Sequence, residues 1–204
     1  MSSPATKSVY PSGFCKTIVT IGASMGGPKA LCEVLSKIPT GLNAAFLIVQ
    51  HLPSGFSKSF AQRLNSLSSL TVKEAEHGER IKADYAYLAP DNYHLEVGFL
   101  NNKLSLILKQ SPCVNGHRPS VDVLKNSVAK INCSKIGVIM TGMGSDGAQG
   151  MLEFKKTGAL NIGESAETCV VYGMSKASQK LGALDYEVPL YKIAEYIVQA
   201  LKKC

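Results

Sequence analysis

The sequence predicts an α/β fold: a doubly wound, mostly parallel sheet flanked by helices, with an appended antiparallel β-hairpin. Continuous apolar runs such as Ala44–Val49 and Ile136–Met140 are each followed by a segment whose apolar residues recur at helical spacing. This alternation is typical of parallel strands covered by helices on both faces. Between these units, Tyr85–Lys109 alternates apolar and polar residues, as half-exposed antiparallel strands do. The chain has 204 residues, 45% of them hydrophobic, which is sufficient for a core of its own.

The first strand–helix unit begins after a polar stretch with Pro and Ser, which we expect to be a flexible arm over residues 1–15. A strand over Lys16–Ile21 leads to Gly26-Gly27-Pro28, and proline suits the first turn of a helix. The apolar residues of that helix share one face: Ala30, Leu31, Val34, Leu35 and Ile38. The Ala44–Gln50 strand then precedes a helix around Phe60, Leu64 and Leu67.

The middle of the chain is predicted to form the hairpin region. Its strands are the segments YAYLAP, YHLEVG and KLSLILK, joined by turns at Pro90-Asp91-Asn92 and Asn101-Asn102. Five further elements follow. They are the Ile136–Met140 strand, a helix through Met151, Leu152 and Phe154, a short strand over Ala159–Gly163, a small helix over Tyr172–Leu181, and a last helix with Ile193, Ile197 and Leu201 on one face. No repeat or interior linker divides the chain, so we expect a single domain over residues 16–204.

Composition argues against several classes of protein. The apolar runs are far shorter than the roughly 18 residues of a membrane span, and the N-terminus lacks the apolar stretch of a secretory signal. We therefore expect a cytoplasmic protein without membrane insertion. The six cysteines form no CxxC pair, so we interpret them as reduced thiols and expect neither disulfides nor a metal site. No motif indicates a cofactor, and we expect none.

The formal net charge of +7 favours an acidic partner, although Lys and Arg never form a run of five. A nucleotide- or nucleic-acid-binding protein is the least favoured class. It would need a phosphate-binding loop, or aromatic residues clustered with basic ones, and the sequence shows neither.

Ser24 is the first candidate for chemistry. It lies in Ile21-Gly-Ala-Ser-Met-Gly-Gly27, a GxSxG pattern where a strand gives way to a helix. Flanking glycines allow a sharp turn that exposes the hydroxyl, and the following helix directs free N–H groups and a positive dipole end toward it. Ser24 is therefore a candidate nucleophile. A helix N-cap is the alternative interpretation, and it is the commoner one for an isolated motif.

His51 and Asp146 are the candidate partners. His51 follows the Ala44–Gln50 strand, and Asp146 follows the Ile136–Met140 strand within a glycine-rich segment. Carboxyl ends of parallel strands meet at one edge of a sheet, so one cleft can gather these two residues and Ser24. Taken singly, His51 is more often structural, and Asp146 more often a cap or turn residue. His77, His94 and His117 are interpreted as surface or half-buried residues.

Six blocks of the sequence together resemble the catalytic domain of the chemotaxis protein-glutamate methylesterases, the CheB family. The resemblance covers about residues 16–201, and its blocks are IGASMGGPKAL (21–31), VQHLPSGFSKSFAQRL (49–64), LAPDNYHLEV (88–97), HRPSVDVL (117–124), MTGMGSDGAQGM (140–151) and VVYGMSKA (170–177). The family's nucleophile matches Ser24, its general base His51 and its orienting carboxylate Asp146. The resemblance implies hydrolysis of γ-glutamyl methyl esters on the cytoplasmic helices of chemoreceptors, with release of methanol and a related deamidation of receptor glutamines.

Other roles follow from this resemblance. We expect backbone N–H groups near Met25, Gly26 and Met143 to form the oxyanion hole, although a smaller or hydroxyl-bearing residue was expected in place of Met25. Arg118 is a candidate for orienting an acidic receptor helix, or else a solvated arginine before an N-cap at Ser120. The partners expected are chemoreceptor cytoplasmic domains and other chemotaxis signalling proteins.

Two further expectations concern regulation and the alternative function. Family members commonly carry an N-terminal receiver domain, whereas only about 15 residues precede the first strand here. We therefore expect a stand-alone catalytic domain, or one excised from a larger protein, without phosphorylation control in cis. The alternative function is a non-catalytic signalling module that binds chemoreceptor or kinase partners, and the presence of Ser24, His51 and Asp146 together argues against it.

Overall fold

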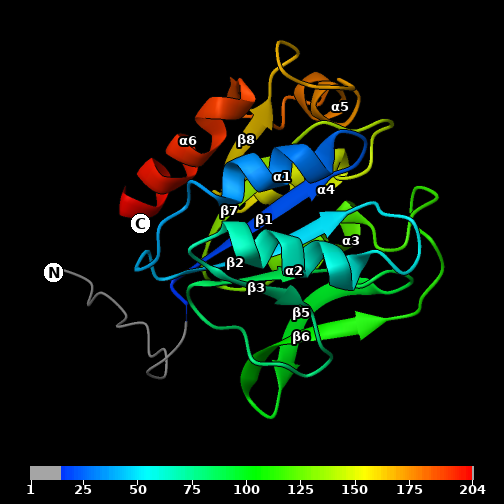
Figure 1. The fold of residues 1–204 in the computed structure, drawn as a ribbon, viewed down its shortest axis with the longest axis vertical. Helices are drawn as coiled ribbons and strands as arrows, with labels where there is room; N and C mark the ends of the chain where they lie inside the picture. The colour runs from blue at the N-terminus through cyan, green and yellow to red at the C-terminus, as the bar shows by residue number, and fades with distance from the viewer. Residues whose placement is uncertain (1–14, 204) are drawn as a thin grey trace, which may run out of the picture.

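A seven-stranded parallel sheet runs through the protein in the computed structural model, which describes residues 15–203 (Figure 1). The arm predicted for residues 1–15 lies, apart from Cys15, outside the described residues. The strands lie side by side in the order β3-β4-β2-β1-β7-β8-β9, and every pairing is parallel. Their bounds are β1 Thr17–Ala23, β2 Ala44–Gln50, β3 Thr71–Glu74, β4 Tyr85–Leu88, β7 Ser134–Ile139, β8 Leu160–Glu164 and β9 Tyr186–Val188.

Helices cover both faces of this sheet, so the predicted doubly wound α/β fold is confirmed. One face carries α1 (Gly27–Leu35), α2 (Ser57–Leu67) and α6 (Leu190–Lys203), and the other carries α3 (Val121–Ala129), α4 (Ala148–Lys156) and α5 (Met174–Lys180). Every residue of β1 and β2 is buried, because side chains that alternate between two helix-covered faces never reach solvent. The continuous apolar runs of the sequence reflect this double burial.

The hairpin prediction was right for two of its three strands. β5 (His94–Leu100) and β6 (Lys103–Lys109) pair antiparallel as a separate two-stranded sheet. Asn101 and Asn102 both have positive φ, 49° and 59°, which matches the twist of a tight hairpin turn. The hairpin packs against α3, where the Val97 N–H donates to Ser127 Oγ at 2.9 Å.

The third predicted hairpin strand, YAYL, is instead β4 of the parallel sheet, beside β2. Its alternation indicated a half-exposed strand because tyrosine counts as partly polar. Tyr87 is nevertheless fully buried, and its hydroxyl is satisfied there: it accepts from the Lys82 N–H at 3.2 Å and donates to the Arg80 carbonyl at 3.4 Å. The edge strands β3 and β9, four and three residues long, were not predicted.

The other predicted elements occur close to their expected positions. They are the strands now seen as β1, β2, β7 and β8 and the helices α1, α2, α4, α5 and α6. No helix among residues 15–203 is long and apolar enough to cross a membrane.

Candidate active site at the carboxyl edge of the sheet

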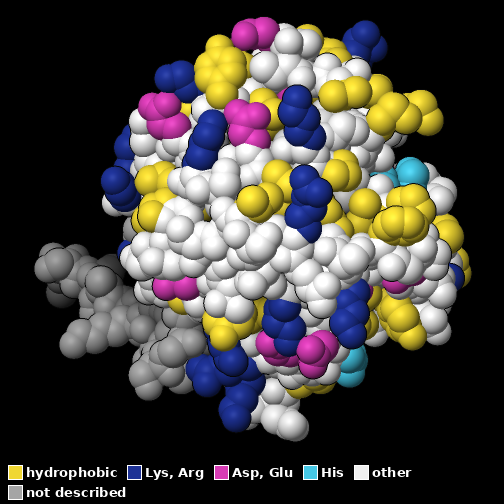
Figure 2. Space-filling model, viewed as in Figure 1, with side chains coloured by type: hydrophobic (Ala, Val, Ile, Leu, Met, Phe, Trp, Pro, Cys, Tyr) yellow, Lys and Arg dark blue, Asp and Glu magenta, His cyan; other side chains and the backbone are white. Residues whose placement is uncertain are grey.

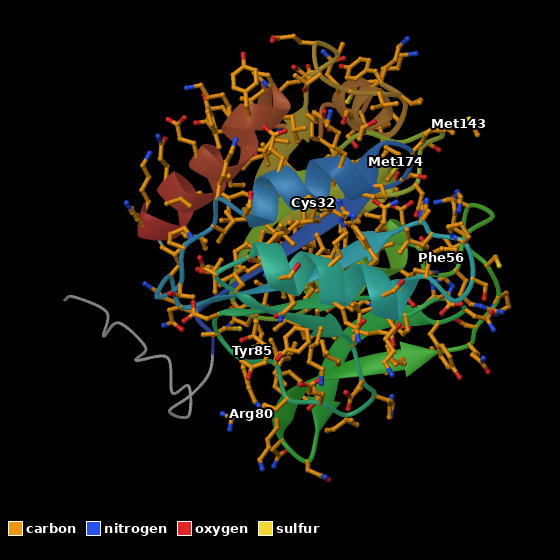
Figure 3. All side chains as sticks on the ribbon, viewed as in Figure 1. Cys32, Phe56, Arg80, Tyr85, Met143 and Met174 are labelled. Carbon is orange, nitrogen blue, oxygen red and sulfur yellow. The ribbon has the colours of Figure 1, made fainter. Side chains whose placement is uncertain are left out.

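Ser24 and His51 are neighbours at the carboxyl ends of β1 and β2. The strand register ends with Ala23 opposite Gln50, and the His51 N–H donates to the Ala23 carbonyl at 3.1 Å. Ser24 and His51, which directly follow these strands, therefore lie next to each other at the carboxyl edge of the sheet. Met143, Met174 and Phe56 are labelled at this end of the molecule in Figure 3.

The turn that carries Ser24 is held by hydrogen bonds on both sides. The Ser24 N–H donates to the Thr141 carbonyl at 3.0 Å, and the Ser24 carbonyl accepts from the Gly27 N–H at 2.9 Å and from Gln50 Nε2 at 2.8 Å. Gly26 has φ 82°, and a Cβ at Gly27 would collide with the Gln50 amide. Gly26 and Gly27 thus allow a sharp turn after Ser24 that β-carbons would prevent.

Asp146 is 1% exposed and is bonded to His51, whose Nε2 lies 3.0 Å from Asp146 Oδ2. Four other donors reach the same carboxylate: Ser120 Oγ (2.7 Å), the Val121 N–H (2.7 Å), Asn115 Nδ2 (3.1 Å) and the Asp122 N–H (3.3 Å). Three of these come from the N-terminus of α3, where free N–H groups and the helix dipole favour an anion. Burial alone would raise the pKa of Asp146, but the bonds from His51, Ser120 and the other donors outweigh it and lower the pKa to about 2.

The second ring nitrogen of His51 remains available. His51 is 10% exposed, and its buried Nδ1 has no hydrogen-bond partner among the described residues. A neutral imidazole that donates from Nε2 to Asp146 carries a lone pair on Nδ1, so this nitrogen is an acceptor. The Ser24 hydroxyl likewise makes no hydrogen bond with residues 15–203, which leaves both groups free at adjacent positions.

His117 is half-buried, within the interpretation made from the sequence, and it lies against His51, whereas His94 is fully buried and its interpretation as a surface or half-buried residue is wrong. The His51 and His117 rings stack with centroids 3.8 Å apart and planes 10° from parallel. Burial and the neighbouring His51 lower the pKa of His117, against an opposing effect of Asp146. The loop returns to the site through Asn115 and Gly116, which both have positive φ, and through the paired backbones of Val114 and His117. The polar composition of this loop does not indicate from the sequence that the chain folds back onto the site.

Arg118 forms part of the wall of the site, but its donors are used within the protein. Its guanidinium donates to Asn92 Oδ1 at 3.1 Å and to the Ser111 carbonyl at 2.9 Å, which ties the loop to the segments before β5 and after β6. A hollow of about 260 Å³ opens there, lined by His51, Leu52, Asn92, Cys113, Gly116, His117, Arg118 and Pro119.

The residues predicted to supply the oxyanion hole border the same edge. Met25 and Met143 are 54% and 66% exposed. Thr141 Oγ1 donates to the Met25 carbonyl at 2.8 Å and so fixes the peptide beside Ser24. Within the part of the chain that the structure describes, the N–H groups of Met25, Gly26 and Met143 have no acceptor. They are therefore free to donate to a ligand atom.

Several positioning residues were missed at the sequence level. Gln50 ties Ser24 to His51 by donating to both carbonyls, Asn115 bridges Asp146 to Asp122, and Thr141 supports Met25. Thr141 lies within the glycine-rich segment 140–151, and Asn115 lies just before the HRPS segment 117–120. Proximity to these motifs is the one signal in the sequence that could have identified the two residues. Among residues 15–203, no three His, Cys, Asp or Glu side chains gather in a way that could hold a metal ion.

The fold and site together define a doubly wound α/β protein that gathers a serine, a histidine and an aspartate at one edge of its sheet. The chain belongs to the CheB methylesterase family, whose family model matches residues 19–197.

Two curated relatives, both named protein-glutamate methylesterase/protein-glutamine glutaminase, come from Pyrococcus abyssi and Halalkalibacterium halodurans. They are 43% and 48% identical over 197 and 194 residues, which is 96% and 95% of this chain but 54% and 56% of theirs. The chain thus spans about half the length of the curated relatives it matches. The crystal structure of the Thermotoga maritima CheB methylesterase catalytic domain superposes with a TM-score of 0.87 at 44% identity, covering 90% of this chain and 97% of that one.

Proposed function

We propose that this protein is a serine hydrolase that demethylates γ-glutamyl methyl esters on the cytoplasmic helices of chemoreceptors, releasing methanol. The proposal rests chiefly on His51, whose Nε2 is bonded to Asp146 at 3.0 Å, whose Nδ1 has no hydrogen-bond partner among the described residues, and whose N–H bonds to Ala23, the residue before Ser24. The names of its relatives, which pair a methylesterase with a glutaminase, support both the ester substrate and a related deamidation of receptor glutamines. Chemoreceptors, and chemotaxis signalling proteins generally, are the proposed partners, and the cytoplasm is the proposed compartment.

In the first half-reaction, Ser24 Oγ attacks the ester carbonyl while His51 Nδ1 accepts the hydroxyl proton. The carbonyl oxygen becomes an oxyanion, and the free N–H groups of Met25, Gly26 and Met143 are the proposed donors to it. The carbon–oxygen bond to the methoxy group then breaks. The proton on Nδ1 passes to the departing methoxide, which leaves as methanol, and the glutamyl group remains esterified to Ser24.

In the second half-reaction, water replaces the serine. His51 Nδ1 takes a proton from water, the hydroxide attacks the acyl carbon, and the Ser24 oxygen recovers the proton as the glutamate carboxylate is released. A glutamine side chain follows the same course with ammonia as the leaving group. No step requires a cofactor.

Asp146 acts through His51 in both halves. Its low pKa keeps the carboxylate charged, so it stabilises the imidazolium that forms when Nδ1 is protonated. Its bond to Nε2 also fixes the tautomer with the lone pair on Nδ1. The N-terminus of α3 in turn fixes the carboxylate.

The test is methanol release from a chemoreceptor cytoplasmic fragment that carries radiolabelled methyl esters. Wild-type protein should release volatile label, and Ser24→Ala should reduce release to the blank. Ser66→Ala is the matched control, because Ser66 is an exposed serine of α2 whose hydroxyl bonds only to the Arg63 carbonyl. Equal rates for Ser24→Ala and the wild type would refute the nucleophile. No release from several methylated receptors would favour the non-catalytic signalling module instead.

A further inference from the structure

A groove between α1 and α2 runs along the sheet face that also carries α6 and opens near the candidate active site. Its volume is about 570 Å³, and it is lined by Pro28, Lys29, Cys32, Leu52, Phe56, Ser59, Phe60 and Arg63. Figure 3 shows Cys32 on α1 where it faces α2, and Phe56 near the end of α2 on the side of the carboxyl edge. Phe56 is 58% exposed, an unusual position for a large aromatic side chain.

The groove has an apolar floor and a basic rim. Lys29 and Arg63 line it and are exposed, and Lys58 is exposed on the same helix as Arg63. None of these three cations forms an ion pair with a described residue, whereas the lysine–carboxylate pairs of residues 15–203 all lie elsewhere. Figure 2 views this face, where Lys and Arg side chains are interspersed with hydrophobic ones.

No acidic side chain lines the groove, and α2 contains none. Glu33, the nearest acidic residue in sequence to Cys32, is already paired with Lys37 at 3.2 Å. The local potential is therefore positive over an apolar surface. A partner that presents carboxylates on either side of an apolar stripe complements both features.

The groove adjoins the candidate active site. Leu52 lines both the groove and the hollow that contains His51 and His117. Phe56 lies five residues after His51, on the loop that joins β2 to α2. A segment lying along the groove therefore passes the catalytic edge at one end.

We propose that the groove between α1 and α2 docks an acidic amphipathic helix of the chemoreceptor substrate. Its apolar side contacts Phe56 and Phe60, and its carboxylates face Lys29 and Arg63. This docking rests on the proposed function for the identity of the partner, which is a receptor helix that carries methylated glutamates among acidic residues. A helix is the favoured shape, since a groove between two helices accepts a third in the manner of other helix-binding grooves. Docking along α1 and α2 presents one glutamyl ester to Ser24 and places the neighbouring turns on the basic rim.

The kinetic test compares two substrates. One is a methylated acidic receptor fragment, and the other is the γ-methyl ester of N-acetyl-glutamate amide, which is too small to reach the groove. The ratio of kcat/KM for the fragment to kcat/KM for the small ester should fall by about tenfold or more in Lys29→Glu/Arg63→Glu. Lys103→Glu/Lys202→Glu makes the same change in net charge on exposed lysines of β6 and α6, and it should leave the ratio unchanged.

Direct binding separates docking from catalysis. In a Ser24→Ala background, a fluorescein-labelled helical peptide with glutamates flanking a leucine stripe should bind, and affinity should fall with added salt. The Lys29→Glu/Arg63→Glu change should weaken binding by about tenfold or more and reduce its salt dependence. A scrambled peptide of the same composition should bind weakly, because its leucines no longer share one face. Phe56→Ser should weaken binding without abolishing the salt effect, and far-UV circular dichroism verifies that each variant is folded.

Several results would overturn the docking proposal. They are equal binding of the two peptides, equal binding by wild type and Lys29→Glu/Arg63→Glu, or loss of binding in Lys103→Glu/Lys202→Glu. A wild-type dimer that Phe56→Ser dissociates would assign the groove to a second copy of the chain instead. Peptide binding that follows these expectations, in a protein that hydrolyses no glutamyl methyl ester, would refute the proposed function and leave the acidic-helix groove standing.

Discussion

Replacing Asp146 with asparagine should destabilise the protein in a pH-dependent manner. Hydrogen bonds from His51, Ser120, Val121 and Asn115, working against burial, lower the pKa of this carboxylate from an ordinary value of 3.8 to about 2. A pKa difference of roughly 2 corresponds to roughly 2 to 3 kcal/mol of folding free energy, since a pKa difference of 1 is equivalent to about 1.4 kcal/mol. Asparagine is isosteric but uncharged, so the variant should lose about this amount at pH 7.

The sign of the pH dependence follows from the direction of the pKa difference. A carboxylate with a depressed folded-state pKa stabilises the native state above its unfolded pKa, and this contribution disappears as pH falls through the folded value. The difference in unfolding free energy between wild type and Asp146→Asn should therefore narrow from roughly 2 to 3 kcal/mol at pH 7 to about half of that at pH 3. Other carboxylates titrate in both proteins, so their effects cancel in the difference.

Urea unfolding monitored by circular dichroism at pH 7, 5, 4 and 3 measures this gap. Similar slopes against urea for the two proteins would show that the denatured states are comparable. A gap that stays constant between pH 7 and pH 3, or a variant as stable as the wild type at pH 7, would refute the assignment of Asp146 as a strongly stabilised carboxylate. Esterase activity should fall by roughly 10⁴-fold at pH 7, because asparagine offers Nε2 no charge and permits the wrong tautomer.

Three other changes test the surroundings of the site. Ser120→Ala removes the side chain that accepts from the Val123 N–H and donates to Asp146, so thermal unfolding should show a loss of about 1 to 2 kcal/mol, and Ser120→Thr should recover most of it. His117→Phe should retain kcat and His117→Ala should lower it, if the ring stacked at 3.8 Å holds His51 in place; equal values would mean that the stack has no positioning role. Gly142→Ala places a Cβ 2.8 Å from Ser24 Cβ and against Met174, so kcat should fall by about 10²-fold with a smaller effect on KM, and an unchanged kcat would contradict the close contact.

The sheet was predictable from sequence because its signal is local. β1 and β2 are buried on both faces, so most of their residues are apolar, with Thr17, Thr20 and Gln50 as buried exceptions. The candidate residues Ser24 and His51 follow directly at the ends of these strands. β4 was predicted as part of the hairpin because its residues alternate like those of the two strands that follow, whereas Tyr87 is buried and its hydroxyl is satisfied by backbone groups that the sequence does not reveal. The edge strands β3 and β9 are too short to show any periodicity.

The loop before α3 was beyond prediction for a different reason. Its conformation depends on Asn115 and Gly116, whose positive φ angles return the chain to the sheet edge, and its residues contact partners far away in sequence. Asn115 bonds to Asp146, 31 residues later, and His117 stacks on His51, 66 residues earlier. Polar loop composition is equally compatible with a solvated loop, so only the assembled structure distinguishes the two.

The position of Asp146 shows how this site couples stability to chemistry. In sequence, an aspartate just before a helix is usually that helix's own cap, yet α4 is capped by Gly147 with φ 92° and no side-chain bond. Asp146 instead accepts hydrogen bonds from the N-terminus of α3, namely from the N-cap Ser120 and from the Val121 N–H. This helix also supports the hairpin. The same carboxylate therefore anchors a helix of the core and orients His51. Weakening the start of α3 should disturb the His51 imidazole even though the hydrogen bonds of the Ser120 N–H and hydroxyl go to His94, Asp146 and Val123. The activity of Ser120→Ala, measured alongside its stability, tests this coupling.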